Sequence, residues 1–114
     1  MTHPRRGEIY WVDFEPAQGS EPNKVRPALV VQNDTGNRFS STTIVVAITS
    51  RQPTKEYPFL VCLPDDLLPQ PSVAVCTLVR TVSLGRLSGG PVAVCDAAVM
   101  DRVDQALRHT FALT

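Results

Sequence analysis

The amino-acid sequence predicts a mainly β (α+β) protein, a small barrel or strongly bent sheet with one helix packed against it near the C-terminus. Ten prolines and six glycines punctuate the 114 residues at short intervals. The segments between them are rich in β-branched and aromatic residues, which is typical of a compact β-rich domain. The C-terminal segment instead repeats apolar residues at every fourth position, as an amphipathic helix does. No repeat or linker divides the chain, so we expect residues 1–114 to form a single domain.

The N-terminal half predicts three strands. Aromatic and β-branched side chains indicate a first strand at Glu8–Phe14. A long polar loop, Glu15–Lys24, follows, and loops of this length in a small domain usually have a function. The second and third strands are expected at Arg26–Asn33 and Thr42–Thr49, with the turn residues of Asp34–Ser41 between them.

The C-terminal half predicts shorter strands and the helix. Strands are expected at Tyr57–Leu63 and Ser72–Val79, with a further short one at Thr81–Leu84. The glycines and proline of Leu87–Pro91 indicate a turn. Asp96 is a suitable N-cap for the final helix. The buried stripe of that helix is expected to consist of Val99, Val103, Leu107 and Phe111.

Composition and charge limit the possible classes of protein. Eleven basic and eleven acidic residues cancel, so the chain lacks the overall basic footprint of many nucleic-acid-binding proteins. Its apolar runs are far shorter than the roughly 20 residues that span a bilayer, and no apolar segment follows Arg5 and Arg6 as a secretion signal requires. Cys62, Cys76 and Cys95 have no metal-ligand spacing, which predicts reduced, buried thiols in a cytoplasmic protein without a metal or cofactor.

One cation and one hydroxyl pair stand out at the ends of neighbouring predicted strands. Arg26 opens an apolar strand, and Pro27 favours extended backbone at this position. Its guanidinium has a planar fork of donors that suits phosphate or carboxylate. Thr49 and Ser50 close the next apolar strand, so an anion site is possible there. From the residues alone, a surface ion pair for Arg26 and strand-end capping for the hydroxyls are the commoner roles.

Histidine chemistry has little support in this sequence. His3 and His109 are the only histidines, and each lies near a chain end. A two-histidine ribonuclease site, a Ser-His-Asp triad or a histidine-rich metal site is therefore not expected.

Ordered blocks along the chain resemble MazF/PemK-type toxins and cover nearly all of it. The blocks are Arg6–Phe14, Gly19–Glu21, Val25–Asp34, Gly36–Ser40, Thr43–Thr49, Val79–Val82 and Leu84–Leu87. The resemblance implies a small SH3-like barrel of about five to seven strands with a C-terminal helix, and a homodimer. It also implies the toxin half of a type II toxin–antitoxin pair, which cleaves single-stranded RNA without metal and is inhibited by a MazE-like antitoxin with an acidic tail.

The resemblance assigns roles to individual residues. It implies that Arg26 and Thr49 are catalytic, with Glu21 a weaker catalytic candidate. Contacts to RNA are expected from Ser20, Lys24, Asn37, Ser50, Leu78 and Arg80. Many members carry an acidic residue and a glutamine where this chain has Thr77 and Leu78, so the RNA sequence that is cleaved stays open.

Other interpretations remain open at this level. A non-enzymatic CcdB-like toxin that binds DNA gyrase shares the fold class and needs no arginine–hydroxyl pair. A small-barrel interaction module would tolerate substitution of Arg26. Arg80 can equally serve a structural ion pair, and Tyr10 and Trp11 are expected in the core more often than on an RNA-binding face.

Overall fold

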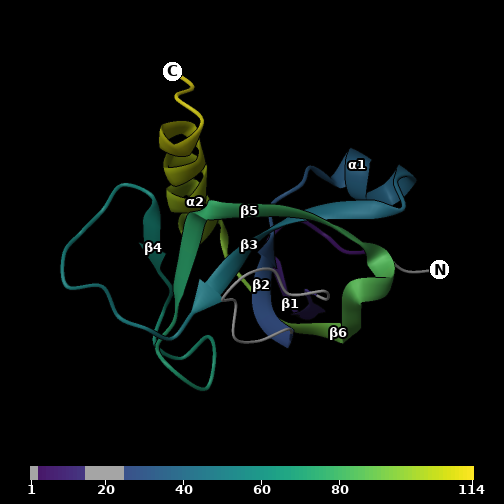
Figure 1. The fold of residues 1–114 in the computed structure, drawn as a ribbon, viewed down its shortest axis with the longest axis horizontal. Helices are drawn as coiled ribbons and strands as arrows, with labels where there is room; N and C mark the ends of the chain where they lie inside the picture. The colour runs from purple at the N-terminus through teal and green to yellow at the C-terminus, as the bar shows by residue number, and fades with distance from the viewer. Residues whose placement is uncertain (1–2, 15–24) are drawn as a thin grey trace.

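The computed structural model describes residues 3–14 and 25–114, and its core is one curved antiparallel sheet (Figure 1). The six strands lie in the order β4-β5-β3-β2-β1-β6, and within the described residues β4 and β6 are the edge strands. The predicted mainly β fold with a C-terminal helix is confirmed. In chain order the elements are β1 (Glu8–Asp13), β2 (Val25–Val30), α1 (Asp34–Phe39), β3 (Thr42–Thr49), β4 (Leu60–Cys62), β5 (Val73–Ser83), the 3-10 helix η1 (Leu84–Arg86), β6 (Leu87–Val94) and α2 (Ala97–Thr110).

The sheet bends at two breaks in strand register. On β3 and β5, Val46 faces Val79 but the next residue, Ala47, faces Val75, so the intervening residues of β5 lie outside this ladder. Figure 1 shows β5 turning a sharp corner. A second break separates Ile9 from Trp11 where β1 pairs with β6. Bulges of this kind bend the strand that carries the extra residues and increase its twist.

Several predicted elements differ from the structure, among them the strand expected at Tyr57–Leu63, which is limited to Leu60–Cys62. Residues 34–39 form the helix α1 rather than a turn, because the side chain of Asn33 caps it by accepting the N–H of Gly36 at 2.7 Å. The short strand expected at 81–84 is not a separate element, because residues 81–83 are the end of β5 and Leu84 begins η1. The turn expected at 87–91 is wrong, because these residues belong to β6 and Gly89, with φ 61°, lies within its bulge.

Curvature places the apolar side chains in two clusters on opposite faces of the sheet. Leu29 and Val46 belong to the cluster that α2 covers, together with Val103 from that helix. Ala28 and Val45 point to the other face and belong to the second cluster. This is the alternation that extended strands require. Because both faces of β2 and β3 are buried, the two strands form the rigid centre of the molecule.

The expected helix stripe and buried cysteines are confirmed in part. Val99 and Val103 are buried, whereas Phe111 follows the last helical residue and is 54% exposed. Cys76 and Cys95 are buried as expected. The prediction for Cys62 is wrong, because this residue ends the edge strand β4 and is exposed.

Arg6 joins the N-terminal segment to both helices. Its backbone N–H donates to Asp34 Oδ1 at 2.7 Å, and its Nε donates to the carbonyl of Val31 at 2.8 Å. Its guanidinium pairs with Asp104 of α2 at 2.6 Å. Among the described residues, no helix has the length and apolar character needed to cross a membrane.

Candidate active site

Arg26 and Thr49 occupy facing positions at the same end of β2 and β3. The two strands are antiparallel, with Ala28 opposite Ala47. Continuing this register to the end of both strands places Arg26 opposite Thr49. Side chains that face each other in this way have Cβ atoms roughly 4.5–5.5 Å apart. The sequence therefore folds so that a cation and a hydroxyl, far apart along the chain, become neighbours on a rigid support.

Both residues line a pocket of about 550 Å³, which we call the strand-end pocket. Its walls are largely apolar and come from β1, β6 and the segment before β5. Arg26, Thr49 and Ser50 supply the cation and the hydroxyls. The remaining lining residues are Trp11, Val25, Pro27, Ile48, Leu67, Leu68, Pro69, Gln70, Ser72 and Val92. Apolar walls around a few polar groups are typical of small-ligand sites.

The hydroxyl of Thr49 is already oriented by the backbone. Its Oγ1 accepts the N–H of Arg51 at 3.1 Å. A threonine hydroxyl has one proton and two lone pairs, so this bond leaves its proton free to be donated to a ligand oxygen. The adjoining loop is held in place, because Gln52 Nε2 donates to the carbonyls of Ser50 and Pro71 at 3.2 and 3.1 Å.

A second pocket, of about 360 Å³, shares Arg26 with the first. We call it the bulge pocket, because Thr77 and Leu78 from the bulge of β5 lie in its wall. Its other lining residues are Phe14, Ala47, Val79 and Arg80. The guanidinium carbon of Arg80 lies 5.1 Å from the centre of the Phe14 ring, which is a cation–π contact. Arg26 therefore lies on the boundary between two pockets.

The structure brings together five of the predicted site residues and separates others from them. Arg26, Thr49 and Ser50 meet in the strand-end pocket, and Leu78 and Arg80 meet Arg26 in the bulge pocket. Leu78 is 51% exposed, so it is accessible to a ligand. The predicted residues Ser20, Glu21 and Lys24 lie outside the described residues.

Asn37 needs a correction, because its side chain is not accessible. It is fully buried, and its Oδ1 accepts the hydroxyl of Thr43 at 2.6 Å and the Nε2 of Gln32 at 3.0 Å. Its Nδ2 donates to the carbonyl of Gln32 at 3.0 Å and to Asp34 Oδ1 at 3.2 Å. These bonds hold α1 against β3. Both polar atoms of the Asn37 side chain are occupied and buried, so the side chain offers no surface to RNA.

Trp11 is a site residue that the sequence reasoning missed. It is 45% exposed and lines the strand-end pocket with Arg26 and Thr49, so its expected place in the core is wrong. Tyr10 is buried as expected, and burial together with its hydrogen bond to Glu8 raises the pKa of Tyr10 to about 12. The signal was present in the sequence, because strand alternation puts Trp11 on the opposite face from its two neighbours.

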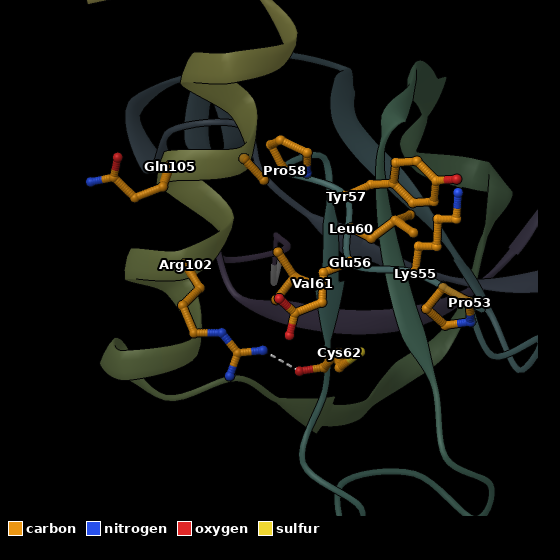
Figure 2. Close-up of a pocket in the computed structure, with 11 residues that line it drawn as sticks. Pro53, Lys55, Glu56, Tyr57, Pro58, Leu60, Val61, Cys62, Arg102 and Gln105 are labelled. Atoms are coloured by element: carbon orange, nitrogen blue, oxygen red, sulfur yellow. Dashed lines mark hydrogen bonds between the residues drawn. The ribbon is translucent and has the colours of Figure 1, made fainter.

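A larger groove lies elsewhere in the described structure. It has a volume of about 740 Å³ and runs between α2 and residues 53–62, which include β4. Figure 2 shows its lining, with the guanidinium of Arg102 donating to the carbonyl of Cys62. None of the described site residues lines it, so size alone does not identify the site. Within the described part of the chain, no group of three or more histidine, cysteine and carboxylate residues could hold a metal ion.

The fold and the arginine–hydroxyl pocket define a small, mainly β protein with a site suited to a phosphate-containing ligand. The family model for PemK-like, MazF-like toxins of type II toxin–antitoxin systems matches residues 5–111, so the chain belongs to this family. It is 40% identical over 111 residues to the endoribonuclease EndoA of Bacillus subtilis (strain 168), a match that spans 96% of this chain and 95% of EndoA.

Solved structures agree with this assignment. MazF from Deinococcus radiodurans is 28% identical and superposes with a TM-score of 0.81, over 98% of this chain and 99% of that one. A MazE–MazF complex from the same organism gives a TM-score of 0.78 at 28% identity, over 97% of each chain. The expected fold, with its curved sheet and C-terminal helix, is thus the MazF fold.

Proposed function

We propose that this chain is a sequence-specific, metal-independent endoribonuclease that cleaves single-stranded RNA through a 2′,3′-cyclic phosphate. The observation that carries the proposal is the pairing of Arg26 with Thr49 on facing strand ends in one pocket. Family membership and the 40% identity to EndoA support the same activity. As a toxin acting on RNA, the protein would work in the cytoplasm.

The proposed chemistry uses the nucleophile that RNA itself carries. The 2′-oxygen attacks the adjacent phosphorus, the bond from phosphorus to the 5′-oxygen breaks, and the products are a 2′,3′-cyclic phosphate and a 5′-hydroxyl. Negative charge builds on the non-bridging oxygens in the transition state. The Arg26 guanidinium and the Thr49 hydroxyl proton are donors suited to these oxygens. Their positions on packed strands keep both donors oriented before the reaction.

The proposed reaction also needs a group that accepts the proton of the 2′-hydroxyl. The 2′-hydroxyl must lose its proton, and a threonine hydroxyl at neutral pH is too weak a base to take it. Glu21 is the proposed acceptor. The leaving 5′-oxygen then takes a proton from solvent.

The partners proposed for this chain follow from its relatives. A Deinococcus radiodurans MazF was crystallised with MazE. We propose that this chain is likewise inhibited by a MazE-like antitoxin, whose acidic tail would compete with RNA for Arg26 and Arg80. A homodimer is proposed on the same family basis.

The test is cleavage of a long single-stranded RNA in EDTA by the wild type, Arg26→Ala and Thr49→Ala. Removal of one oxyanion donor costs about 10²–10³ in rate, so both variants should lose that much. Arg108→Ala, an exposed arginine of α2 that lines neither pocket, is the matched control. No cleavage by the wild type across diverse sequences would overturn the proposal, and inhibition of gyrase supercoiling would favour the CcdB-like alternative.

A further inference from the structure

We infer that Gln52 is a positioning residue of the candidate active site, because its side chain holds the two sides of the strand-end pocket at a fixed spacing. The inference rests on the proposed ribonuclease function. In the described structure Gln52 is not one of the residues that line the pocket. It acts on the reaction through the residues that it holds.

Two segments far apart in the chain form the sides of this pocket. On one side β3 ends, and Thr49 and Ser50 supply the hydroxyls. On the other side lies the segment 67–72, which leads into β5. The β3–β5 ladder joins the two sides as far as the pair of Thr49 and Val73. Both strands stop at this pair, so beyond it the spacing of the two sides is set by contacts other than the ladder.

The side chain of Gln52 supplies such a contact. Pro71 has no backbone N–H, so its backbone offers only a carbonyl. Gln52 Nε2 donates to this carbonyl at 3.1 Å and to the carbonyl of Ser50 at 3.2 Å. An amide nitrogen has two protons, so one side chain can make both bonds at once. We call these two bonds the Gln52 bridge, which links the hydroxyl side of the pocket to the opposite side.

The bridge holds the backbone beside the Thr49 hydroxyl. Ser50 follows Thr49 directly, and the next residue, Arg51, donates its N–H to Thr49 Oγ1 at 3.1 Å. Catalytic groups must be in position before the reaction, and a displacement of about 1 Å can cost about 10²-fold in rate. Thr49 is proposed to act on charge that develops in the transition state. Loss of the bridge should therefore lower kcat and leave KM nearly unchanged.

The substitution Gln52→Met tests the bridge, because methionine is of similar length, carries no charge and has no N–H to donate. We expect kcat on a fixed single-stranded RNA to fall about 5- to 30-fold, which corresponds to the loss of two hydrogen bonds at an exposed position. Gln105→Met, at an exposed glutamine of α2 that lines neither site pocket, is the matched control and should cleave like the wild type.

A Thr49→Ala background separates positioning from a loss of folded protein. If Gln52 acts by holding the Thr49 hydroxyl, Gln52→Met should cause little further loss of kcat once that hydroxyl is absent. A smaller folded fraction would instead lower cleavage by the same factor in both backgrounds. An equal loss in both backgrounds, or an unchanged kcat in the single variant, would overturn the inference while leaving the ribonuclease proposal intact.

Trp11 allows a second measurement that needs no cleavage. It is the only tryptophan of the chain, and it lines the strand-end pocket with 45% of its surface exposed. Loss of the bridge should open the pocket, so acrylamide should quench the fluorescence of Gln52→Met more strongly than that of the wild type or Gln105→Met. Equal quenching in all three proteins would overturn the inference. Failure of the wild type to cleave any RNA would overturn the proposed function and the catalytic part of this inference, whereas the quenching tests the bridge itself.

Discussion

The role of Asn37 can be decided by one substitution, Asn37→Leu, which removes the amide and keeps a side chain of similar bulk. The buried hydroxyl of Thr43 would lose its acceptor, and Gln32 would lose two hydrogen bonds, one made by its side-chain amide and one by its backbone carbonyl. A buried polar group left without a partner costs about 1–3 kcal/mol, and each lost hydrogen bond about 0.5–1.5 kcal/mol. We expect the free energy of unfolding to fall by about 2–4 kcal/mol, because Thr43 is fully buried and cannot recover its bond from water.

Urea denaturation measures this loss, and a second substitution tests its cause. Thr43→Val removes the orphaned hydroxyl, so the double variant should regain part of the stability that Asn37→Leu loses. Cleavage per mole of folded protein should stay at the wild-type level in both. Unchanged stability together with a large loss of cleavage would contradict a structural role for Asn37 and restore it as an RNA contact.

Two further predictions concern ionisable groups. Burial raises the pKa of Cys76 and Cys95 to about 11, so at pH 8 only Cys62 should react rapidly with a thiol reagent, and all three thiols should react in urea. The backbone N–H of Arg6 lowers the pKa of Asp34, so its ionised form stabilises the folded state at neutral pH and this contribution is lost as pH falls through the lowered pKa. Asp34→Asn should therefore be less stable than wild type at pH 7, with the difference shrinking below about pH 4 in thermal unfolding curves.

Elements defined by local pattern could be predicted from the sequence. The third strand was expected at Thr42–Thr49 and has these bounds, because its β-branched residues are buried on both faces. The N-cap of the final helix is Asp96, whose carboxylate accepts the N–H of Val99 at 2.9 Å. In both cases the residues that determine the element lie within it or directly beside it.

The last strand could not be predicted, because its determinants lie far away in the chain. Gly89, Gly90 and Pro91 are turn residues by composition, yet they form the bulge of a strand that pairs with β1. The exposure of Trp11 is of the same kind only in part: strand alternation separates Trp11 from Tyr10 and Val12, but packing decides how much of each face of β1 is covered. Bulges and sheet order are set by packing between distant segments, which local propensity does not describe.

The candidate site was predictable as a set of residues but not as a geometry. Arg26 and Thr49 could be selected by residue type and family resemblance. Their alignment requires the β2–β3 register, which is specified by burial of both faces of the two strands. The contact of Arg80 with Phe14, and the sharing of Arg26 by two pockets, could be found only in the folded chain.

The architecture separates the residues proposed for catalysis from exposed residues expected to contact RNA. Arg26 and Thr49 belong to strands whose other side chains fill both cores, so their backbone cannot shift without disturbing the packing. Thr77 and Leu78 lie in the bulge of β5, outside the ladder with β3, and are exposed. A substitution at these two positions changes the pocket wall at little cost in stability, because no core contact or ladder bond depends on the side chain. The bulge that bends the sheet therefore also supplies exposed side chains beside Arg26 that can change without moving the strands that carry Arg26 and Thr49.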